Sequence, residues 1–205
     1  MHARELAVEG ALEFTPRVIP DDRGVFISPF QEQAFAEAHG GPLFRVAQTN
    51  HVRSKRGVVR GVHYTATPPG IAKYVYCARG KALDIILDTR IGSPTFARWD
   101  TVLMDQQDNR AVYVPVGVGH AFVALEDDTV MMYMLSGGYV ARNELSLSAM
   151  DPALGLPIDA GVEPTLSDRD RGAITFAEAQ RQGLLPDYAT SLGIERRLSE
   201  ASFSV

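Results

Sequence analysis

The feature that most limits the fold is a series of short strand-like segments in the middle of the chain. Residues 81–88 alternate, with leucine and isoleucine side chains on one face and Asp84 among the residues on the other. Three further segments are short and rich in β-branched and aromatic residues: 112–114, 120–125 and 130–135. Turn-forming residues separate the strands, at 68–70, 92–94, 105–109 and 126–128. Many short strands divided by turns predict a mostly β fold, an antiparallel sandwich or barrel.

Helix signals occur only near the two ends of the chain. Near the N-terminus, Ser28-Pro29-Phe30-Gln31 is typical of a capping box with proline at the first helical position. Gly40-Gly41 ends this predicted helix after His39, and its apolar residues form one stripe. Helices confined to the ends leave the middle of the chain to the sheets.

Two more helices are predicted near the C-terminus. Thr175, with Glu178 three residues later, predicts a helix that ends at a glycine, and a shorter helix is expected over 194–201. No internal repeat, low-complexity linker or change in composition divides the chain. We therefore expect one domain over residues 1–205, with a helical C-terminal segment over 175–205.

Composition excludes several classes of protein. The formal net charge of −5 argues against non-specific binding of nucleic acid. No apolar run approaches the roughly 18 residues that a membrane span needs, and the first residues lack the apolar core of a secretory signal. The single cysteine, Cys77, excludes a disulfide framework. We therefore expect a cytoplasmic protein whose partners include neither nucleic acid nor a membrane.

Motifs for several common cofactors and nucleophiles are missing. The sequence has no GxGxxG or P-loop pattern and no GxSxG elbow. Of the five histidines, His51, His63 and His120 fall in the strand-rich region, but no HxH pair is present. We favour a site without metal, and convergence of the three histidines on a metal stays an alternative.

Polar side chains concentrate in one predicted strand pair, in the segments 48–50 and 56–64 and at Lys73. Charged and polar groups inside a barrel cost several kcal/mol unless they are paired or used. A functional site is one interpretation of this cluster. The alternative is that Arg60 and Lys73 face solvent and that His63 is a core histidine with satisfied hydrogen bonds.

Strict strand alternation separates two residues of this cluster. It places Arg60 and His63 on opposite faces, so both can line one cavity only if the strand contains a bulge. Glycine permits such a bulge, and Gly57 and Gly61 are the two candidates. We therefore predict a bulge at one of them; without it, either Arg60 or His63 lies outside the site.

Ordered motifs from about Arg4 to Tyr188 resemble the dTDP-4-dehydrorhamnose 3,5-epimerase family of the cupin superfamily. They are Asp21-Asp22-Arg23-Gly24-Val25-Phe26, Gln48-Thr49-Asn50, Arg60-Gly61-Val62-His63-Tyr64, Gly92-Ser93-Pro94-Thr95-Phe96, Gly119-His120-Ala121-Phe122 and Leu166-Ser167-Asp168-Arg169-Asp170. The chain is most similar to the subgroup that makes deoxysugars for antibiotics, notably its carbon-5 epimerases.

The resemblance implies a cupin-type jelly-roll barrel that forms a homodimer and uses no metal or cofactor. It implies an isomerase that inverts C-5 of a dTDP-4-keto-6-deoxyhexose, because a proton beside the ketone becomes acidic when the carbanion can delocalise onto oxygen. Inversion at C-3, or at both carbons, is an alternative, and so are a 3,4-ketoisomerase, a non-catalytic sugar-binding cupin and a metal oxygenase.

Four catalytic roles follow from the resemblance. His63 is expected to be the base, a role that contributes about 10²–10⁴-fold, with Asp170 accepting its other ring N–H. Lys73 is expected to stabilise the enolate oxygen, and Tyr133 to return a proton from the opposite side.

The resemblance also implies binding residues, among them diphosphate and nucleotide contacts, other polar contacts and a tyrosine that stacks on thymine. They are Arg23, Phe26, Gln48, Thr49, Asn50, Arg60, His120, Tyr139, Glu144 and Arg169. Departures from the family pattern at Ser28, Val52 and Thr65 suggest a specialised sugar. An N-terminal strand over 4–14 is expected to add to a partner's sheet edge.

Overall fold

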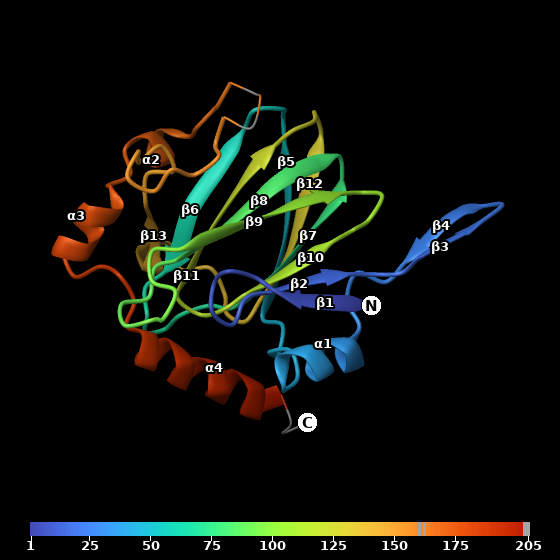
Figure 1. Cartoon of the computed structure of the whole chain (residues 1–205), viewed down its shortest axis with the longest axis horizontal. Helices are drawn as coiled ribbons and strands as arrows, with labels where there is room; N and C mark the ends of the chain where they lie inside the picture. Colours follow the sequence, from blue (N-terminus) through green and yellow to red (C-terminus); the bar gives the residue numbers. More distant parts are fainter. Residues whose placement is uncertain (160, 162, 203–205) are drawn as a thin grey trace.

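Two antiparallel sheets face each other in a computed structural model that describes residues 1–159, 161 and 163–202 (Figure 1). The six-stranded sheet has the order β1 (His2–Glu5), β2 (Leu12–Thr15), β10 (Ala111–Val114), β7 (Lys73–Arg79), β12 (Thr129–Leu135), β5 (Gln48–Ser54). The five-stranded sheet has the order β13 (Glu144–Ser146), β6 (Val59–Thr65), β11 (Val118–Ala124), β8 (Lys81–Asp88), β9 (Trp99–Asp105). Apart from β8 and β9, successive strands from β5 to β13 alternate between the sheets, as in a jelly roll. The predicted mostly β, cupin-type fold is confirmed.

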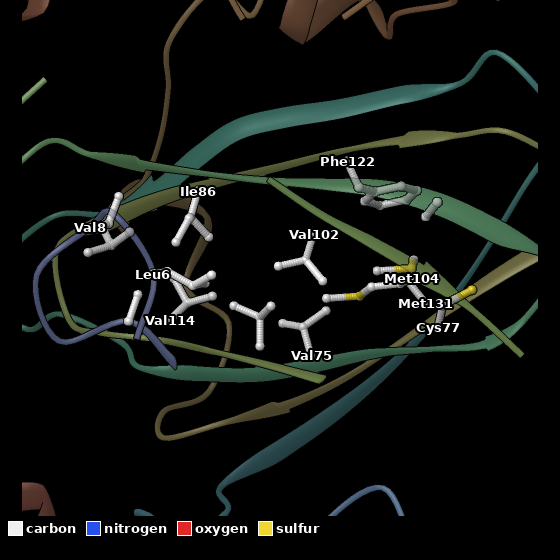
Figure 2. Close-up of a cluster of buried hydrophobic side chains, with 14 of the residues drawn as sticks. Leu6, Val8, Val75, Cys77, Ile86, Val102, Met104, Val114, Phe122 and Met131 are labelled. Carbon is white, nitrogen blue, oxygen red and sulfur yellow. The ribbon is translucent and has the colours of Figure 1, made fainter. Parts of the chain in front are cut away.

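The main core fills the space between the two sheets (Figure 2). Val75 and Val114 enter from the six-stranded sheet and meet Ile86 and Phe122 from the five-stranded sheet. Cys77 is a free thiol buried in this core, and burial raises its pKa to about 11. The apolar contacts between the two sheets fill this space, so a polar pocket can lie only beyond the apolar layer.

Strand β8 is buried on both faces, and this explains its alternating sequence. Ile85 and Leu87 face outward into a second cluster with Phe176 and Ala179 of α3 (Phe176–Arg181). On the inward face, Ala82 and Ile86 belong to the main core. The predicted alternation therefore separates two apolar environments, and not core from solvent.

The first helix, α1 (Glu32–His39), begins later than predicted. Its N-cap is Gln31, which makes no side-chain capping hydrogen bond, so the predicted capping box at Ser28 is wrong. Tertiary contacts hold the chain before it: the Tyr74 hydroxyl donates to the Pro29 carbonyl at 2.7 Å, and the Phe30 ring packs edge-on against Tyr74. The predicted end after His39 is confirmed, because Gly40 adopts the left-handed conformation with φ 83°.

The C-terminal helices follow the prediction in part. The capping box of Thr175 and Glu178 is present at the start of α3. Helix α4 (Tyr188–Ser202) begins well before the predicted 194, because the Asp187 carboxylate accepts the Thr190 N–H at 2.7 Å and starts the helix there. Residues 203–205 of the predicted segment lie outside the described residues, and the single-domain interpretation stays a prediction.

The N-terminal region forms two strands and not one. β1 and β2 pair with each other, with Arg4 opposite Glu13, and β2 also pairs with β10. The predicted single strand over 4–14 is therefore wrong, because the chain reverses between the two strands, at Gly10 with φ 77°. β1 is the edge of its sheet. No helix within the described ranges is long and apolar enough to cross a membrane.

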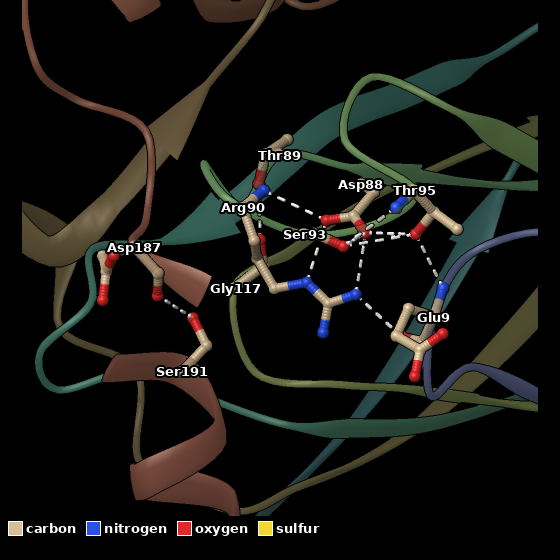
Figure 3. A network of polar contacts seen from close by, with 9 residues as sticks. All are labelled: Glu9, Asp88, Thr89, Arg90, Ser93, Thr95, Gly117, Asp187 and Ser191. Atoms are coloured by element: carbon tan, nitrogen blue, oxygen red, sulfur yellow. Dashed lines mark hydrogen bonds and ion pairs between the residues drawn. The ribbon is translucent and has the colours of Figure 1, made fainter. Parts of the chain in front are cut away.

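A buried polar network ties the N-terminal loop to the end of β8 (Figure 3). The Arg90 guanidinium donates to both carboxylate oxygens of Asp88 and to the Glu9 carbonyl, while the Ser93 and Thr95 hydroxyls each donate to Asp88 at 2.6 Å. Burial opposes the charge on Asp88, but Arg90 and these hydroxyls outweigh it and lower the pKa of its carboxyl. Ser93 and Thr95 of the family-like segment 92–96 therefore serve the fold.

Candidate active site

One cavity of about 310 Å³ gathers most of the predicted site residues. Nine of them line it: Asn50, Arg60, His63, Lys73, His120, Tyr133, Tyr139, Glu144 and Arg169. Four further residues complete the lining: Val52, Thr65, Ile71 and Leu135. The cavity lies between the sheets, beyond the apolar core that Val52 and Tyr133 touch.

The predicted bulge is present and lies at Gly61. Across β11, His120 pairs with His63 and Phe122 pairs with Arg60, so β6 contains one more residue than its partner strand. Gly61 has φ 113°, and a Cβ atom there would lie 2.4 Å from the His120 carbonyl oxygen. Only glycine fits this position, and the bulge turns Arg60 and His63 into the same cavity.

The two walls of the cavity come from different sheets. On the six-stranded sheet, Asn50 of β5 pairs with Tyr133 of β12. Lys73 of β7 pairs with Leu135, which lies two residues after Tyr133 on β12. His63 of β6 and His120 of β11 pair on the opposite sheet. Tyr133 and His63 therefore enter the cavity from opposite walls.

His63 and Asp170 form a hydrogen-bonded pair at 2.6 Å between Nε2 and Oδ1. Asp170 lies on α2 (Asp168–Arg171), whose N-cap is Ser167. With Nε2–H donating to Asp170, Nδ1 carries the lone pair of the neutral ring. Burial opposes the charge on Asp170, but His63, Ser167 and Arg169 outweigh it and hold the pKa of its carboxyl below the ordinary value.

A second such pair lies deeper in the wall, and the sequence analysis missed its carboxylate. Asp84 of β8 meets His120 at 2.6 Å, again through Nε2 and Oδ1. The His120 ring packs edge-on against Tyr133, with 5.7 Å between the ring centroids. The signal was available: Asp84 falls on the inward face of an apolar strand, where a carboxylate needs a partner.

Two cavity groups have pKa values shifted by burial. Burial lowers the pKa of the Lys73 ammonium, and the nearby carboxylates of Glu144 and Asp84 oppose this shift. Burial raises the pKa of the Tyr133 phenol, and the charge of Asp84 adds to the rise. Tyr133 is therefore a protonated phenol at neutral pH, and burial makes it a weaker acid than an exposed tyrosine.

Hydrogen bonds order the rim of the cavity. Gln48 does not line it but links two residues that do: its amide donates to Asn50 Oδ1 at 2.7 Å and accepts the Tyr139 N–H at 2.8 Å. Thr65 donates to the Glu144 carboxylate at 3.0 Å. Tyr139 is 57% exposed, so a planar group can stack on its ring from solvent.

Besides Gln48, three predicted binding residues do not line this cavity. Thr49 is exposed because it alternates with Gln48 and Asn50 on β5 and faces outward. Arg23 and Phe26 belong to the hairpin of β3 (Val18–Asp21) and β4 (Gly24–Ile27), which projects from the body of the molecule (Figure 1). The Arg23 side chain is 90% exposed and pairs with Asp21, and Phe26 is 64% exposed.

Sequence reasoning also missed two apolar lining residues, Ile71 and Leu135. Leu135 could have been predicted from the sequence, because it lies two residues after Tyr133 on the same strand and so shares its face. Ile71 lies in a loop, where no periodicity indicates a face. Among the described residues, no three or more histidine, cysteine or acidic side chains gather in a way that could hold a metal ion.

The fold and the cavity together define a jelly-roll protein of the cupin type with acid–base side chains on both walls. The family model described as dTDP-4-dehydrorhamnose 3,5-epimerase matches residues 5–178. The chain therefore belongs to the dTDP-4-dehydrorhamnose 3,5-epimerase family, a family of isomerases. The predicted family is confirmed.

Relatives agree with this assignment over nearly the whole chain. A dTDP-4-dehydro-6-deoxyglucose 3-epimerase of a Streptomyces species is 48% identical over 183 residues, which are 89% of this chain and 93% of that protein. A dTDP-4-dehydrorhamnose 3,5-epimerase of Mycolicibacterium smegmatis is 45% identical over 189 residues, 92% of each chain. The crystal structure of ChmJ, a 3'-monoepimerase of Streptomyces bikiniensis in complex with dTDP-quinovose, has a TM-score of 0.90 at 45% identity and covers 97% of this chain and 100% of its own.

Proposed function

We propose that this protein epimerises a dTDP-4-keto-6-deoxyhexose at C-5, in the biosynthesis of a deoxysugar for an antibiotic or a cell-surface glycan. The observation that carries the proposal is the position of a histidine–aspartate pair and a proton-holding tyrosine on opposite walls of one cavity. Inversion at carbon needs a proton to leave one face and another to arrive at the opposite face. A base and an acid from facing sheets meet that need.

The first half of the reaction removes the proton beside the ketone. His63 takes it at Nδ1, while Asp170 accepts the Nε2–H and stabilises the imidazolium that forms. The electron pair of the broken C–H bond moves onto the ketone oxygen, and the Lys73 ammonium stabilises that enolate. A well-placed donor of this kind contributes about 3–4 kcal/mol to transition-state stabilisation.

The second half returns a proton to the other face. The Tyr133 phenol gives its proton to the carbanion carbon, and the enolate collapses to the ketone with the configuration inverted. The position of Tyr133 on the wall opposite His63 supports this role. Burial makes the phenol a weaker acid, so proton transfer depends on the strong basicity of the enolate carbon.

Binding of the nucleotide uses two arginines, one buried histidine and the polar groups of the cavity. Arg60, His120 and Arg169 are proposed to contact the diphosphate. A guanidinium group can donate two parallel hydrogen bonds to a phosphate, and the His120 ring can donate one. Gln48, Asn50 and Glu144 supply polar contacts, and the exposed Tyr139 ring stacks on thymine. Thr49 has no role in this scheme, because it faces away from the cavity.

A homodimer gives Arg23 and Phe26 a role that this chain alone does not. An isolated two-stranded hairpin is marginal in water, and the β3–β4 hairpin exposes Ile19, Val25 and Phe26. We propose that the hairpin packs on a second copy and brings Arg23 and Phe26 to the partner's cavity. Mixing Arg23→Ala and His63→Ala subunits tests this: hybrid dimers regain activity if Arg23 acts on the partner, and stay inactive if it acts within its own chain.

Inversion at C-3 is the second candidate, favoured by relatives that are named 3-epimerases. Incubation with a dTDP-4-keto-6-deoxyhexose in D₂O, followed by NMR, separates the possibilities. Deuterium at C-5 supports the proposal, deuterium at C-3 alone supports the alternative, and label at both supports a 3,5-epimerase. Migration of the ketone to C-3 would indicate an isomerase of another type, and no exchange would indicate a binding protein. A cytoplasmic location stays a prediction from the sequence.

A further inference from the structure

Two short helices beside each other in the sequence begin with the same side-chain arrangement. At α2 the Ser167 hydroxyl accepts the Asp170 N–H at 3.1 Å and donates to Asp170 Oδ2 at 2.8 Å. At α3 the Thr175 hydroxyl accepts the Glu178 N–H at 3.3 Å and donates to Glu178 Oε2 at 2.8 Å. Both are N-caps whose hydroxyl also fixes the carboxylate three residues later.

The two carboxylates differ in what else they contact. Glu178 Oε2 also accepts the backbone N–H of Thr175 at 2.8 Å, so that carboxylate completes its own helix cap. The second oxygen of Asp170 instead meets His63 Nε2 at 2.6 Å, and the Asp170 side chain is only 5% exposed. The cap of α2 is therefore connected to a ring in the cavity, whereas the cap of α3 is not.

We propose that Ser167 is a positioning residue for the reaction, which holds the Asp170 carboxylate so that its Oδ1 faces the His63 ring. This inference rests on the proposed roles of His63 and Asp170. A carboxylate turns about its Cβ–Cγ bond, and its two oxygens are chemically equivalent. With Oδ2 fixed by Ser167, one orientation is retained, and the imidazole that Asp170 orients is fixed with it.

The backbone of helix α2 does little by itself to fix the orientation of the Asp170 carboxylate. It has four residues, so few hydrogen bonds of its own hold Asp170 in place. The titratable and charged groups around the carboxylate are His63 of β6 and Arg169 of the same helix, whose guanidinium donates to the Glu144 carbonyl of β13 at 3.0 Å. The Glu144 carboxylate is turned toward Thr65. Within the part of the chain that the structure describes, Ser167 is the side chain that bonds Oδ2.

The test compares Ser167→Gly with the matched change Thr175→Gly in the full-length enzyme. Each removes one cap hydroxyl, and glycine is itself tolerated at an N-cap, so similar small falls in Tm are expected. We expect Ser167→Gly to lower kcat for C–H exchange about tenfold, with KM within about twofold, and Thr175→Gly to leave both unchanged. Ser167→Thr keeps the hydroxyl and is expected to retain most of kcat.

The pH profile gives a readout that a structural role would not move. Without the Ser167 donor, the Asp170 carboxylate is more basic and stabilises the imidazolium more, so the acid limb of kcat moves to higher pH. Ser167→Asp is the second variant: it keeps a good N-cap but replaces the donor with a negative charge beside Asp170, so a loss at least as large and a larger shift in the same direction are expected.

Two outcomes separate failure of this inference from failure of the proposed function. Parental kcat and pH profile in both Ser167→Gly and Ser167→Asp, with no exchange in His63→Ala, would overturn the role of Ser167 alone. Exchange that survives in His63→Ala would overturn the base on which the inference rests. An equal fall of kcat in Thr175→Gly would also overturn the role of Ser167, because the loss would then follow from lower helix stability.

Discussion

Two histidines of the cavity lining are each paired with an aspartate, through the same kind of hydrogen bond but in different surroundings. Both join Nε2 to Oδ1 at 2.6 Å. The side chains of His63 and Asp170 are 31% and 5% exposed, whereas those of His120 and Asp84 are 5% and 1% exposed. The first pair links a strand to a short helix far along the chain, and the second joins neighbouring strands of one sheet. The difference indicates which pair can exchange a proton with a substrate and which is part of the wall.

The buried pair still influences the chemistry through its neighbours. His120 packs against the Tyr133 ring, and the charge of Asp84 acts on both Tyr133 and Lys73. In the proposed mechanism, the accessible pair takes the proton that leaves, while the buried pair affects the pKa values of Tyr133 and Lys73 on the other wall. Under that proposal, the same chemical unit is a base in one place and a structural part of the cavity wall in the other.

The largest expected effect breaks the accessible pair. His63→Ala should abolish solvent exchange, a loss of at least about 100-fold, with dTDP affinity nearly unchanged, because the base is removed and the nucleotide contacts remain. His120→Ala should instead raise the Kd for dTDP about tenfold, the value of one hydrogen bond to a charged group. Deuterium exchange by NMR and calorimetric titration measure the two effects. Reversed results would exchange the roles of the two pairs.

Loss of the aspartate is expected to cost more stability in the buried pair than in the accessible pair, the reverse of the order expected for catalysis. Asp84→Ala leaves His120 buried without a partner and should lower the free energy of unfolding by about 3 kcal/mol. Asp170→Ala leaves a partly exposed His63 that water can reach, and about 1 kcal/mol is expected. Urea unfolding of both variants checks this, and equal losses would contradict the distinction drawn from burial.

The alkaline side of the pH–rate profile tests the influence of the buried pair on Lys73. Burial lowers the pKa of Lys73 and Asp84 opposes that shift, so Asp84→Asn should lower it further. The alkaline limb of kcat should then move to lower pH by about 0.5 unit, because the ammonium that stabilises the enolate is lost earlier. Asp170→Asn is the control, and a shift of the same size in that variant would count against Asp84 as the cause.

The smallest effect concerns stability in acid. The pKa of Asp170 is lowered in the folded protein, so its contribution to stability is complete above the unfolded pKa of about 3.9. That contribution is lost as the pH falls through the lower folded value. The parent should therefore be more stable than Asp170→Asn at pH about 7, and the gap should shrink below pH about 4. A gap that does not change with pH would contradict the pairing of a charged Asp170 with His63.

The strands and helix α3 were predictable from local patterns in the sequence, whereas most of the site residues were predicted from the resemblance to a known family. Alternation in 81–88 identified β8, and the capping box at Thr175 identified α3. The need for a bulge followed from the conflict between strand alternation and a shared site for Arg60 and His63. Glycine is the residue that such a bulge tolerates, so the conflict and its solution were both present in the sequence.

Other features depend on groups far apart in the chain. Whether a hydroxyl caps a helix depended on tertiary contacts: Ser28 does not cap α1, where Tyr74 holds the Pro29 carbonyl, whereas Ser167 caps α2 and contacts Asp170. The pairing of His120 with Asp84 and the exposed position of Arg23 also depend on tertiary structure, and no local pattern predicts them.

Chain composition and local patterning alone determined that this protein makes antiparallel strands, with a glycine where one of them must bend. Only the tertiary structure decided which polar side chains meet. The reason is that periodicity specifies a face within one element, whereas the partner across the cavity is specified by the packing of two sheets.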